Sequence, residues 1–544
     1  MSRVPLNVFC VPAPGPFRAG SVVPLAGLLA VLLALAGCGD GATPQAPRPH
    51  VLLISIDTLR ADHVGSYGYR LPTTPAIDAL AARGTRFADM TVTTPKTWPA
   101  VASLLTGTVP RTHGVRLQNR VLPAEGDAAL PVIAELLRAE GYRTAGIVTN
   151  YNLLANFGYG RGFDHYVEAW EEAWDEMHKG KPLPDDPLER LKQLFGSAKM
   201  RALFQRTDAK LVTDRALDWL EQDPTGEQPF FLWLHYMDPH GPYDPPPSHA
   251  TLFEGEYPVE EVPYAELKGP HLTYEKGADG KSAPVTDLGF YKARYDREIR
   301  SLDDQLARLF DALEQRGLAD DTLVVLTADH GEALGSHDYY FEHGLQPYEE
   351  CARVPFIVAW PQVLPTGQVV EQPVSLLDVA PTLLELAGVA PPESMEGVSL
   401  APFVRGEPDA RAPEQVFMES GDDRFTDREM QVSVRQGQWK LVFVPDPEDQ
   451  QRLAGQPVEL YDLSQDPSEQ HEVSADNPRV VQKLLADVQR WKREHPVGGG
   501  LSEEDFLEGL DDRSRAFLQA MGYIDLPGDG SPVPPGDPDG ANDG

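Results

Sequence analysis

Several short apolar runs in this chain end directly in carboxylate or imidazole side chains. Continuous apolar runs are typical of strands buried on both faces of a parallel sheet. The carboxyl ends of such strands meet at one edge of the sheet, where α/β folds place their sites. Three runs show the pattern: 50–56 before Asp57, 322–327 before Asp329 and His330, and 230–235 before Asp238 and His240. We therefore expect one site built from several strand ends.

Segments with helical spacing alternate with these runs, at 73–88, 128–140 and 292–316. This alternation predicts an α/β fold, with a large mixed, mostly parallel sheet layered by helices. From about residue 414 the runs become shorter, at 430–435 and 439–444, and a helix is expected at 478–494. A smaller C-terminal α+β subdomain is therefore predicted. The expected boundaries are 50–413 for the main domain, 414–525 for the subdomain and 526–544 for a disordered tail.

The 544-residue chain carries 83 acidic against 47 Lys and Arg residues, a formal charge of −36. No long basic stripe occurs, so nucleic acid is excluded as a partner on electrostatic grounds. An acidic protein that acts on anionic esters would need local positive charge, which bound metal ions can supply.

Residues 1–37 have the pattern of an export signal, with Arg3 and Arg18 before an apolar run from Val22 to Gly37. The segment ends in Leu-Ala-Gly-Cys, which resembles a bacterial lipobox with Cys38 as the lipidated residue. A membrane-spanning helix is the alternative, but the run after Pro24 is shorter than the ~20 residues needed to cross a bilayer. We expect an exported lipoprotein, periplasmic or cell-surface, tethered to a membrane through residues 38–49.

Carboxylates and imidazoles occur together among the predicted site residues. This mixture suits Zn²⁺ or Mn²⁺ better than Ca²⁺ or Mg²⁺, which favour shells of oxygen. A lone His or Asp is more often structural, but the set taken together favours a metal centre. The candidate ligands are Asp57, Asp238, His240, Asp329, His330 and His343.

The segment from Thr97 to Gly107, TWPAVASLLTG, has helix-compatible residues after Pro99. Proline early in a helix is favourable, so Thr97 is expected at a helix N-terminus, where an oxyanion is stabilised. The alternative is that Thr97 only caps the helix.

This segment resembles the active-site signature of the sulfatase family, part of the alkaline phosphatase superfamily. Thr97 takes the place of the Cys or Ser that sulfatases convert to formylglycine, and Val101 that of the signature Arg. Threonine cannot give that aldehyde. The nucleophile is instead similar to that of phosphoester-cleaving relatives.

The resemblance extends over roughly residues 50 to 525. It implies that Asp57, Asp329, His330 and the Thr97 oxygen bind one metal, with Thr58 where sulfatases usually have a second Asp. It implies a second metal at His240 and His343, with Asp238 as a further ligand, and a substrate contact from Asn119. The implied activity is hydrolysis of anionic esters, most of all phosphoric diesters. Sulfate-ester hydrolysis, transfer of a phospho-headgroup and a non-catalytic binding lipoprotein stay open as alternatives.

Overall fold

The computed structural model describes residues 48–116, 122–123, 130–150, 152–169, 208–222, 228–263, 272–276, 282–421, 431–445 and 457–496. Cys38 and Asn119 lie outside these residues, as do the signal, the tether up to residue 47 and the C-terminal tail. No helix in the described part of the chain is long and apolar enough to cross a membrane.

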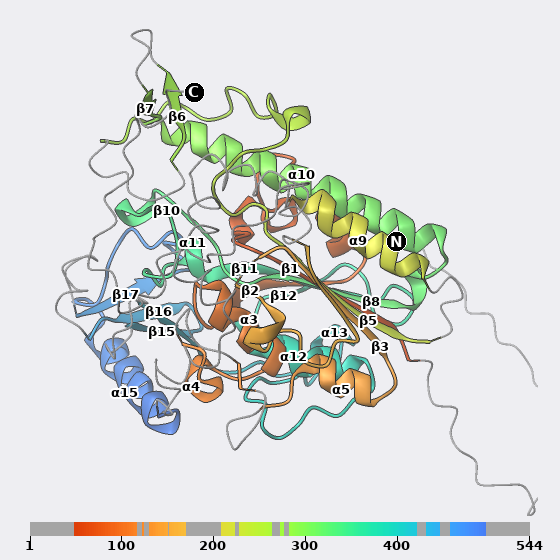
Figure 1. Ribbon diagram of the computed structural model, residues 1–544. Coiled ribbons are helices and arrows are strands. Elements are labelled where there is room, and N and C mark those ends of the chain that lie inside the picture. Colours follow the sequence, from red (N-terminus) through yellow and green to blue (C-terminus); the bar gives the residue numbers. More distant parts are fainter. Residues whose placement is uncertain are drawn as a thin grey trace, which may run out of the picture. The chain divides into compact units, whose positions relative to one another are not determined.

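A nine-stranded sheet forms the centre of the fold (Figure 1). Its order is β12-β2-β11-β8-β1-β5-β3-β4, and β13 also pairs with β2. The central strands are parallel, whereas β11 is antiparallel to both β8 and β2. The expectation of a mixed, mostly parallel sheet is confirmed. The strands are β1 (His50–Ile56), β2 (Thr85–Thr91), β3 (Arg143–Val148), β4 (His165–Glu168), β5 (Phe230–Tyr236), β8 (Thr322–Ala328), β11 (Arg353–Ala359), β12 (Gln368–Val370) and β13 (Val374–Ser375).

Strands β1, β5 and β8 are buried along their whole length, as their apolar sequences predict. In the register, Ser55 pairs with His235 of β5 and Ile56 with Ala328 of β8. Because the three strands run parallel, the residues that follow them emerge at the same edge.

Helices cover both faces of this sheet (Figure 1). The long helix α10 (Leu288–Gln315) and α9 (Ala209–Glu221) lie on one side, and α3 (Thr97–Thr106), α5 (Ile133–Ala139) and α12 (Val379–Leu386) lie on the other. Shorter elements complete this domain: α2 (Pro75–Ala82), α4 (Pro110–His113), α11 (Glu349–Ala352), α13 (Ala401–Val404), β6 (Tyr274–Lys276), β7 (Ser282–Pro284), β9 (Ala333–Leu334) and β10 (Tyr340–Glu342).

A four-stranded antiparallel sheet and one helix form the C-terminal subdomain, as expected. The helix packs on the sheet through buried Leu484, Val488 and Trp491. The elements are β14 (Val416–Ser420), β15 (Gln431–Gln436), β16 (Trp439–Phe443), β17 (Val458–Asp462) and α15 (Pro478–Glu494).

One predicted helix is too long. The segment 73–88 divides into α2, which ends at Ala82, and β2, which begins at Thr85. The chain turns between them at Gly84, where a Cβ would collide with the Val358 carbonyl of β11. Pairing of β2 with β11 thus overrides the helical spacing of the sequence.

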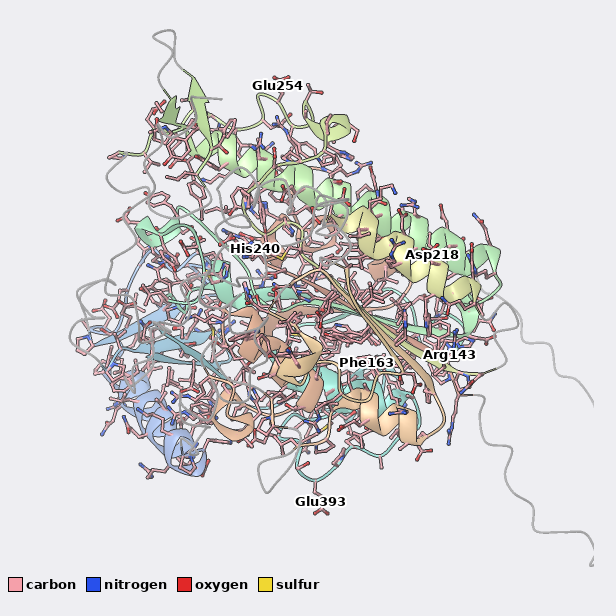
Figure 2. The ribbon with its side chains drawn as sticks, viewed as in Figure 1. Arg143, Phe163, Asp218, His240, Glu254 and Glu393 are labelled. Atoms are coloured by element: carbon pink, nitrogen blue, oxygen red, sulfur yellow. The ribbon has the colours of Figure 1, made fainter. Side chains whose placement is uncertain are left out.

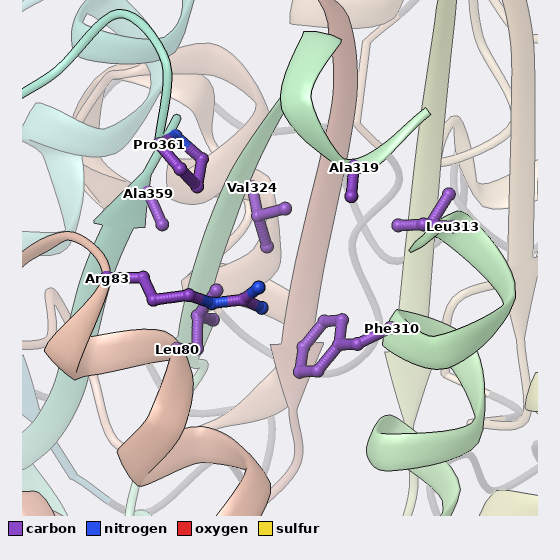
Figure 3. Close-up of a pocket in the computed structure, with 8 residues that line it drawn as sticks. All are labelled: Leu80, Arg83, Phe310, Leu313, Ala319, Val324, Ala359 and Pro361. Carbon is purple, nitrogen blue, oxygen red and sulfur yellow. The ribbon is translucent and has the colours of Figure 1, made fainter. Parts of the chain in front are cut away.

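A small hollow lies beside α2 and α10, lined by Leu80, Arg83, Phe310 and Val324 among others (Figure 3). Val324 is near the start of β8, so the hollow is away from the carboxyl ends of the strands. Its volume of about 20 Å³ is close to what a single water needs. We assign it no function.

Candidate active site

Thr97 is the first residue of α3, a helix in which all ten residues are buried. Lys96 occupies the N-cap position and makes no side-chain cap hydrogen bond. The helix is held firmly, because Tyr159 donates from its hydroxyl to the Trp98 carbonyl over 2.7 Å. Gly107 ends the helix at a φ of 65°, a left-handed conformation that glycine adopts without strain. Thr97 is therefore not the N-cap, and its hydroxyl sits at the positive end of a fixed helix.

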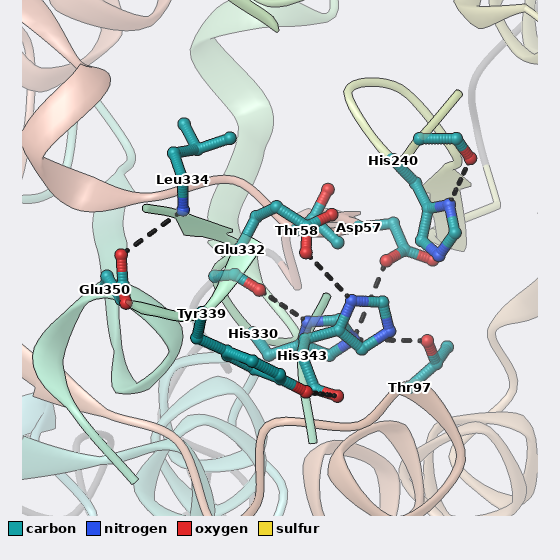
Figure 4. A network of polar contacts seen from close by, with 12 residues as sticks. Asp57, Thr58, Thr97, His240, His330, Glu332, Leu334, Tyr339, His343 and Glu350 are labelled. Carbon is teal, nitrogen blue, oxygen red and sulfur yellow. Dashed lines mark hydrogen bonds and ion pairs between the residues drawn. The ribbon is translucent and has the colours of Figure 1, made fainter. Parts of the chain in front are cut away.

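Asp57, Asp329 and His330 meet at the edge where β1 and β8 end. Figure 4 shows Asp57, His330 and Thr97 facing one another. The His330 Nε2 atom is 3.7 Å from Asp57 Oδ1 and 3.7 Å from Asp329 Oδ2. Thr97 Oγ1 lies 3.3 Å from the same nitrogen. Side chains from two strand ends and one helix N-terminus thus converge on a common point.

The two carboxylates are fully buried, and their charges affect each other. Burial and the negative charge of Asp57 both raise the pKa of Asp329. Burial alone would also raise the pKa of Asp57, but His235, His240 and His330 together lower it. Two buried carboxylates this close are costly unless a cation lies between them.

Two further side chains contact Asp57. Asn150, just after β3, donates from Nδ2 to Asp57 Oδ2 over 2.5 Å. His235, inside β5, has its Nε2 atom 3.6 Å from the same oxygen. Sequence reasoning assigned neither residue. His235 lies within the apolar run of β5, so it resembles a core residue.

His240 and His343 lie beside His330. The ring centroids are 4.3 Å apart for His330 and His343 and 5.2 Å apart for His240 and His343. Figure 2 labels His240 near the centre of the molecule, whereas Glu254 and Glu393 lie at its periphery. Sequence reasoning did not assign Glu332 either; its Oε1 atom lies 3.2 Å from His343 Nδ1.

The surroundings of these three imidazoles shift their pKa values in different directions. Burial opposes protonation of His240, but Asp57 and Glu332 raise its pKa. Burial lowers the pKa of His330, and burial together with the charges of His330 and His240 lowers that of His343. His240 is therefore the imidazole best suited to hold a proton, and His330 is suited to offer a lone pair.

Asp238 is turned toward α9, where its carboxylate interacts with the backbone of Ala209. Burial, with a contribution from Asp208, raises its pKa to about 7.

The residues present fit a divalent metal ion. Asp57 Oδ1, Asp329 Oδ2 and His235 Nε2 are all buried without a hydrogen-bond partner among the described residues. Asp57, His235 and Asp329 also offer ligand atoms that all lie within 4.8 Å of one another. Buried polar atoms are rarely left unpaired, so three converging ones indicate a site for a cation.

Known proteins are similar to this chain in sequence and in fold. The sulfatase family model matches residues 49–389, and the model for the C-terminal part of N-sulphoglucosamine sulphohydrolase matches residues 335–494. Choline-sulfatase of Rhizobium meliloti is 28% identical over 441 residues, which cover 77% of this chain and 83% of that protein.

Two solved structures with similar folds differ in activity. The phosphonate monoester hydrolase of Silicibacter pomeroyi has a TM-score of 0.63 at 22% identity, covering 82% of this chain and 96% of that one. A 2-O GAG sulfatase has a TM-score of 0.59 at 24% identity, covering 86% and 96%. Members of this family are hydrolases of sulfate or phosphate esters. The matched family model, together with the strand-end site, shows that the chain belongs to the sulfatase family.

Proposed function

We propose that this enzyme hydrolyses phosphoric esters, with diesters preferred to monoesters, and that Thr97 is its nucleophile. The observation that carries the proposal is the position of the Thr97 hydroxyl, 3.3 Å from His330 Nε2 and at the start of α3. A threonine cannot become formylglycine, so the nucleophile with which sulfatases cleave sulfate esters cannot form at this position.

Asp57, Asp329 and His330 would hold a metal ion beside this hydroxyl. Such an ion supplies positive charge that lowers the pKa of a neighbouring hydroxyl and attracts an anionic ester. Zn²⁺ and Mn²⁺ suit these ligands. A second ion at His240 and His343 stays a prediction; it would require both imidazoles to be neutral, so a proton on His240 belongs to the enzyme with a single ion bound.

In the proposed reaction, Thr97 and His240 have separate roles. Thr97 loses its proton to solvent and forms a bond from Oγ1 to phosphorus, while the bond to the leaving oxygen breaks. His240, whose pKa is raised, donates a proton to that oxygen. In the second half, water bonds to phosphorus while the bond from phosphorus to Thr97 Oγ1 breaks. His240 takes a proton from this water, and Oγ1 regains a proton from solvent. The free N–H groups at the start of α3 stabilise the anionic phosphoryl group.

The test uses the full chain loaded with Zn²⁺ or Mn²⁺, with nitrophenyl phosphate, bis(nitrophenyl) phosphate and nitrophenyl sulfate as substrates. We expect phosphoester turnover that falls by at least about a thousandfold in Thr97→Ala. Thr97→Ser retains a hydroxyl and should keep measurable turnover. Mass spectrometry of the quenched wild type should find phosphate on Thr97.

Other outcomes would favour the alternatives. Turnover of the sulfate alone would contradict the proposed reaction and favour a sulfatase. Product found on an added alcohol and not on water would indicate a headgroup transferase. A metal-loaded protein that turns over none of the three substrates would indicate a binding lipoprotein.

We also propose that Cys38 carries a lipid that anchors the exported protein to a membrane. Cys38→Ser should then abolish incorporation of labelled palmitate and release the protein from the membrane fraction. Unchanged labelling would contradict the assignment.

A further inference from the structure

A chain of hydrogen bonds runs behind His235, on the side away from the carboxylates. Trp233 donates from Nε1 to Ser55 Oγ over 2.9 Å, and Ser55 Oγ is 2.9 Å from His235 Nδ1. All three side chains are buried. Ser55 and His235 are also direct neighbours in the register of β1 and β5. The imidazole is thus fixed in orientation by its Nδ1 atom.

The other nitrogen of the ring faces the carboxylates. His235 Nε2 is 3.6 Å from Asp57 Oδ2 and has no hydrogen-bond partner among the described residues. At 3.6 Å this contact is longer than a hydrogen bond, and Asp57 Oδ2 already accepts from Asn150. A metal-binding histidine donates its other ring N–H to a neighbour. His235 has this arrangement when Nδ1–H donates to Ser55 Oγ, which then accepts from both Trp233 and His235.

Thr58 explains why such a ligand is needed. It stands where sulfatases usually have a second Asp and offers no carboxylate. Its hydroxyl is buried without a partner. Its backbone N–H instead donates to Asp329 Oδ1 over 3.3 Å, which helps to orient that carboxylate.

We propose that His235 binds the metal through Nε2 and replaces the carboxylate missing at Thr58, with Ser55 and Trp233 holding the ring in position. This inference rests on the metal centre of the proposed function, but not on the choice of phosphate or sulfate. The ligand set becomes two carboxylates, Asp57 and Asp329, with two imidazoles, His235 and His330. Nitrogen ligands favour Zn²⁺ over Ca²⁺, which prefers oxygen. We therefore expect a zinc-selective site.

Metal affinity gives a test that does not depend on activity. Zn²⁺ dissociation constants are measured on the full chain by competition with a chromogenic chelator. His235→Ala and His235→Gln should each weaken binding by about a hundredfold or more, and Ser55→Ala by about 10- to 100-fold. His50→Asn is the matched control, since His50 is also buried, at the opposite end of β1. It should leave Zn²⁺ affinity unchanged.

A second readout reports the ligand directly. Co²⁺ in the wild-type site should give visible absorption bands that change in His235→Gln and stay the same in His50→Asn. The double variant Thr58→Asp/His235→Ala restores an oxygen ligand at position 58. Thr58 has a φ of 55°, a conformation that Asp adopts more readily than a β-branched residue. This variant should bind Ca²⁺ more tightly than wild type and Zn²⁺ more weakly.

The two proposals fail in different ways. Unchanged Zn²⁺ affinity and unchanged Co²⁺ bands in His235→Gln would overturn the inference, even if Thr97→Ala abolishes phosphoester turnover. Zn²⁺ binding that depends on His235 would support the inference, even in an enzyme that turns over no phosphoester.

Discussion

A buried ion cluster joins the C-terminal sheet to the catalytic domain and should be among the most sensitive points of the fold. Lys440 of β16 is 1% exposed, and its Nζ atom lies 2.8 Å from Glu349 Oε1 and 2.8 Å from Glu469 Oε1. Glu349 is the first residue of α11, which directly precedes β11 of the central sheet. Lys440→Met would leave the buried Glu469 carboxylate facing that of Glu349, which is 11% exposed.

Burial determines how much the free energy of unfolding should fall in Lys440→Met. Removing one partner of a buried ion pair costs about 3–5 kcal/mol, because the remaining charge is not solvated. An exposed pair serves as the control: Arg83 and Glu314 lie 2.9 Å apart with side chains 42% and 55% exposed. Such pairs contribute about 0–1 kcal/mol, so Arg83→Ala should have little effect. Urea denaturation followed by tryptophan fluorescence measures both.

The loss should also depend on pH. Burial raises the pKa of Glu469, Lys440 opposes this effect and the charge of Glu349 adds to it. A group with a raised pKa in the folded state contributes stability below its unfolded pKa and loses it as pH rises through the folded value. Without Lys440 the raised pKa would lie higher still. The destabilisation by Lys440→Met should therefore be smaller at pH 5 than at pH 8. A loss below about 1 kcal/mol at pH 8, or one that does not grow with pH, would refute the argument.

Two further predictions concern the metal site. Asn150→Ala removes the donor to Asp57 Oδ2 and should lower Zn²⁺ affinity by about 10- to 100-fold, with Asn477→Ala in the C-terminal subdomain as a control. A Cβ at Gly331, next to His330, would collide with the Glu350 carbonyl. Gly331→Ala should therefore lower the Tm and the metal content measured by mass spectrometry. Gly141→Ala has open space for the Cβ, but its φ of 86° strains any other residue, so it should also lower the Tm while keeping the metal; equal metal loss in both would contradict the steric explanation.

The central strands could be predicted because burial on both faces requires continuous apolar sequence. The same reasoning failed at β2, whose residues are buried or half-buried without a regular alternation and begin three positions after the end of a true helix. Only the partner strand, β11, shows that the chain must turn at Gly84. Long-range pairing of this kind leaves no signal in a local window of sequence.

The site was predictable where it follows strands and not where it lies within them. Asp57, Asp329 and His330 come directly after apolar runs. They are therefore predicted by the rule that α/β folds place their sites at the carboxyl ends of the strands. His235 precedes the last residue of β5, and its neighbours in the sequence are apolar. A signal did exist: Ser55 is a polar residue inside β1, and it pairs with His235. Two polar residues at matching depths in adjacent parallel strands predict a contact, but only once the strands are known to be neighbours.

Thr58 is the position where local preference and structure disagree most clearly. A β-branched residue at a φ of 55° is strained by roughly 1–2 kcal/mol, and its buried hydroxyl without a partner adds about 1–3 kcal/mol. Among the described residues, no hydrogen bond of the Thr58 side chain offsets this cost. The Thr58 carbonyl accepts a hydrogen bond of 2.7 Å from the Tyr295 hydroxyl of α10, and its N–H donates to Asp329. The surrounding helix and strands therefore hold the turn in place, and the turn fixes Asp57 beside Asp329. Strain that persists at a site built from ligands indicates that the position of Asp57 matters more than the stability of the turn.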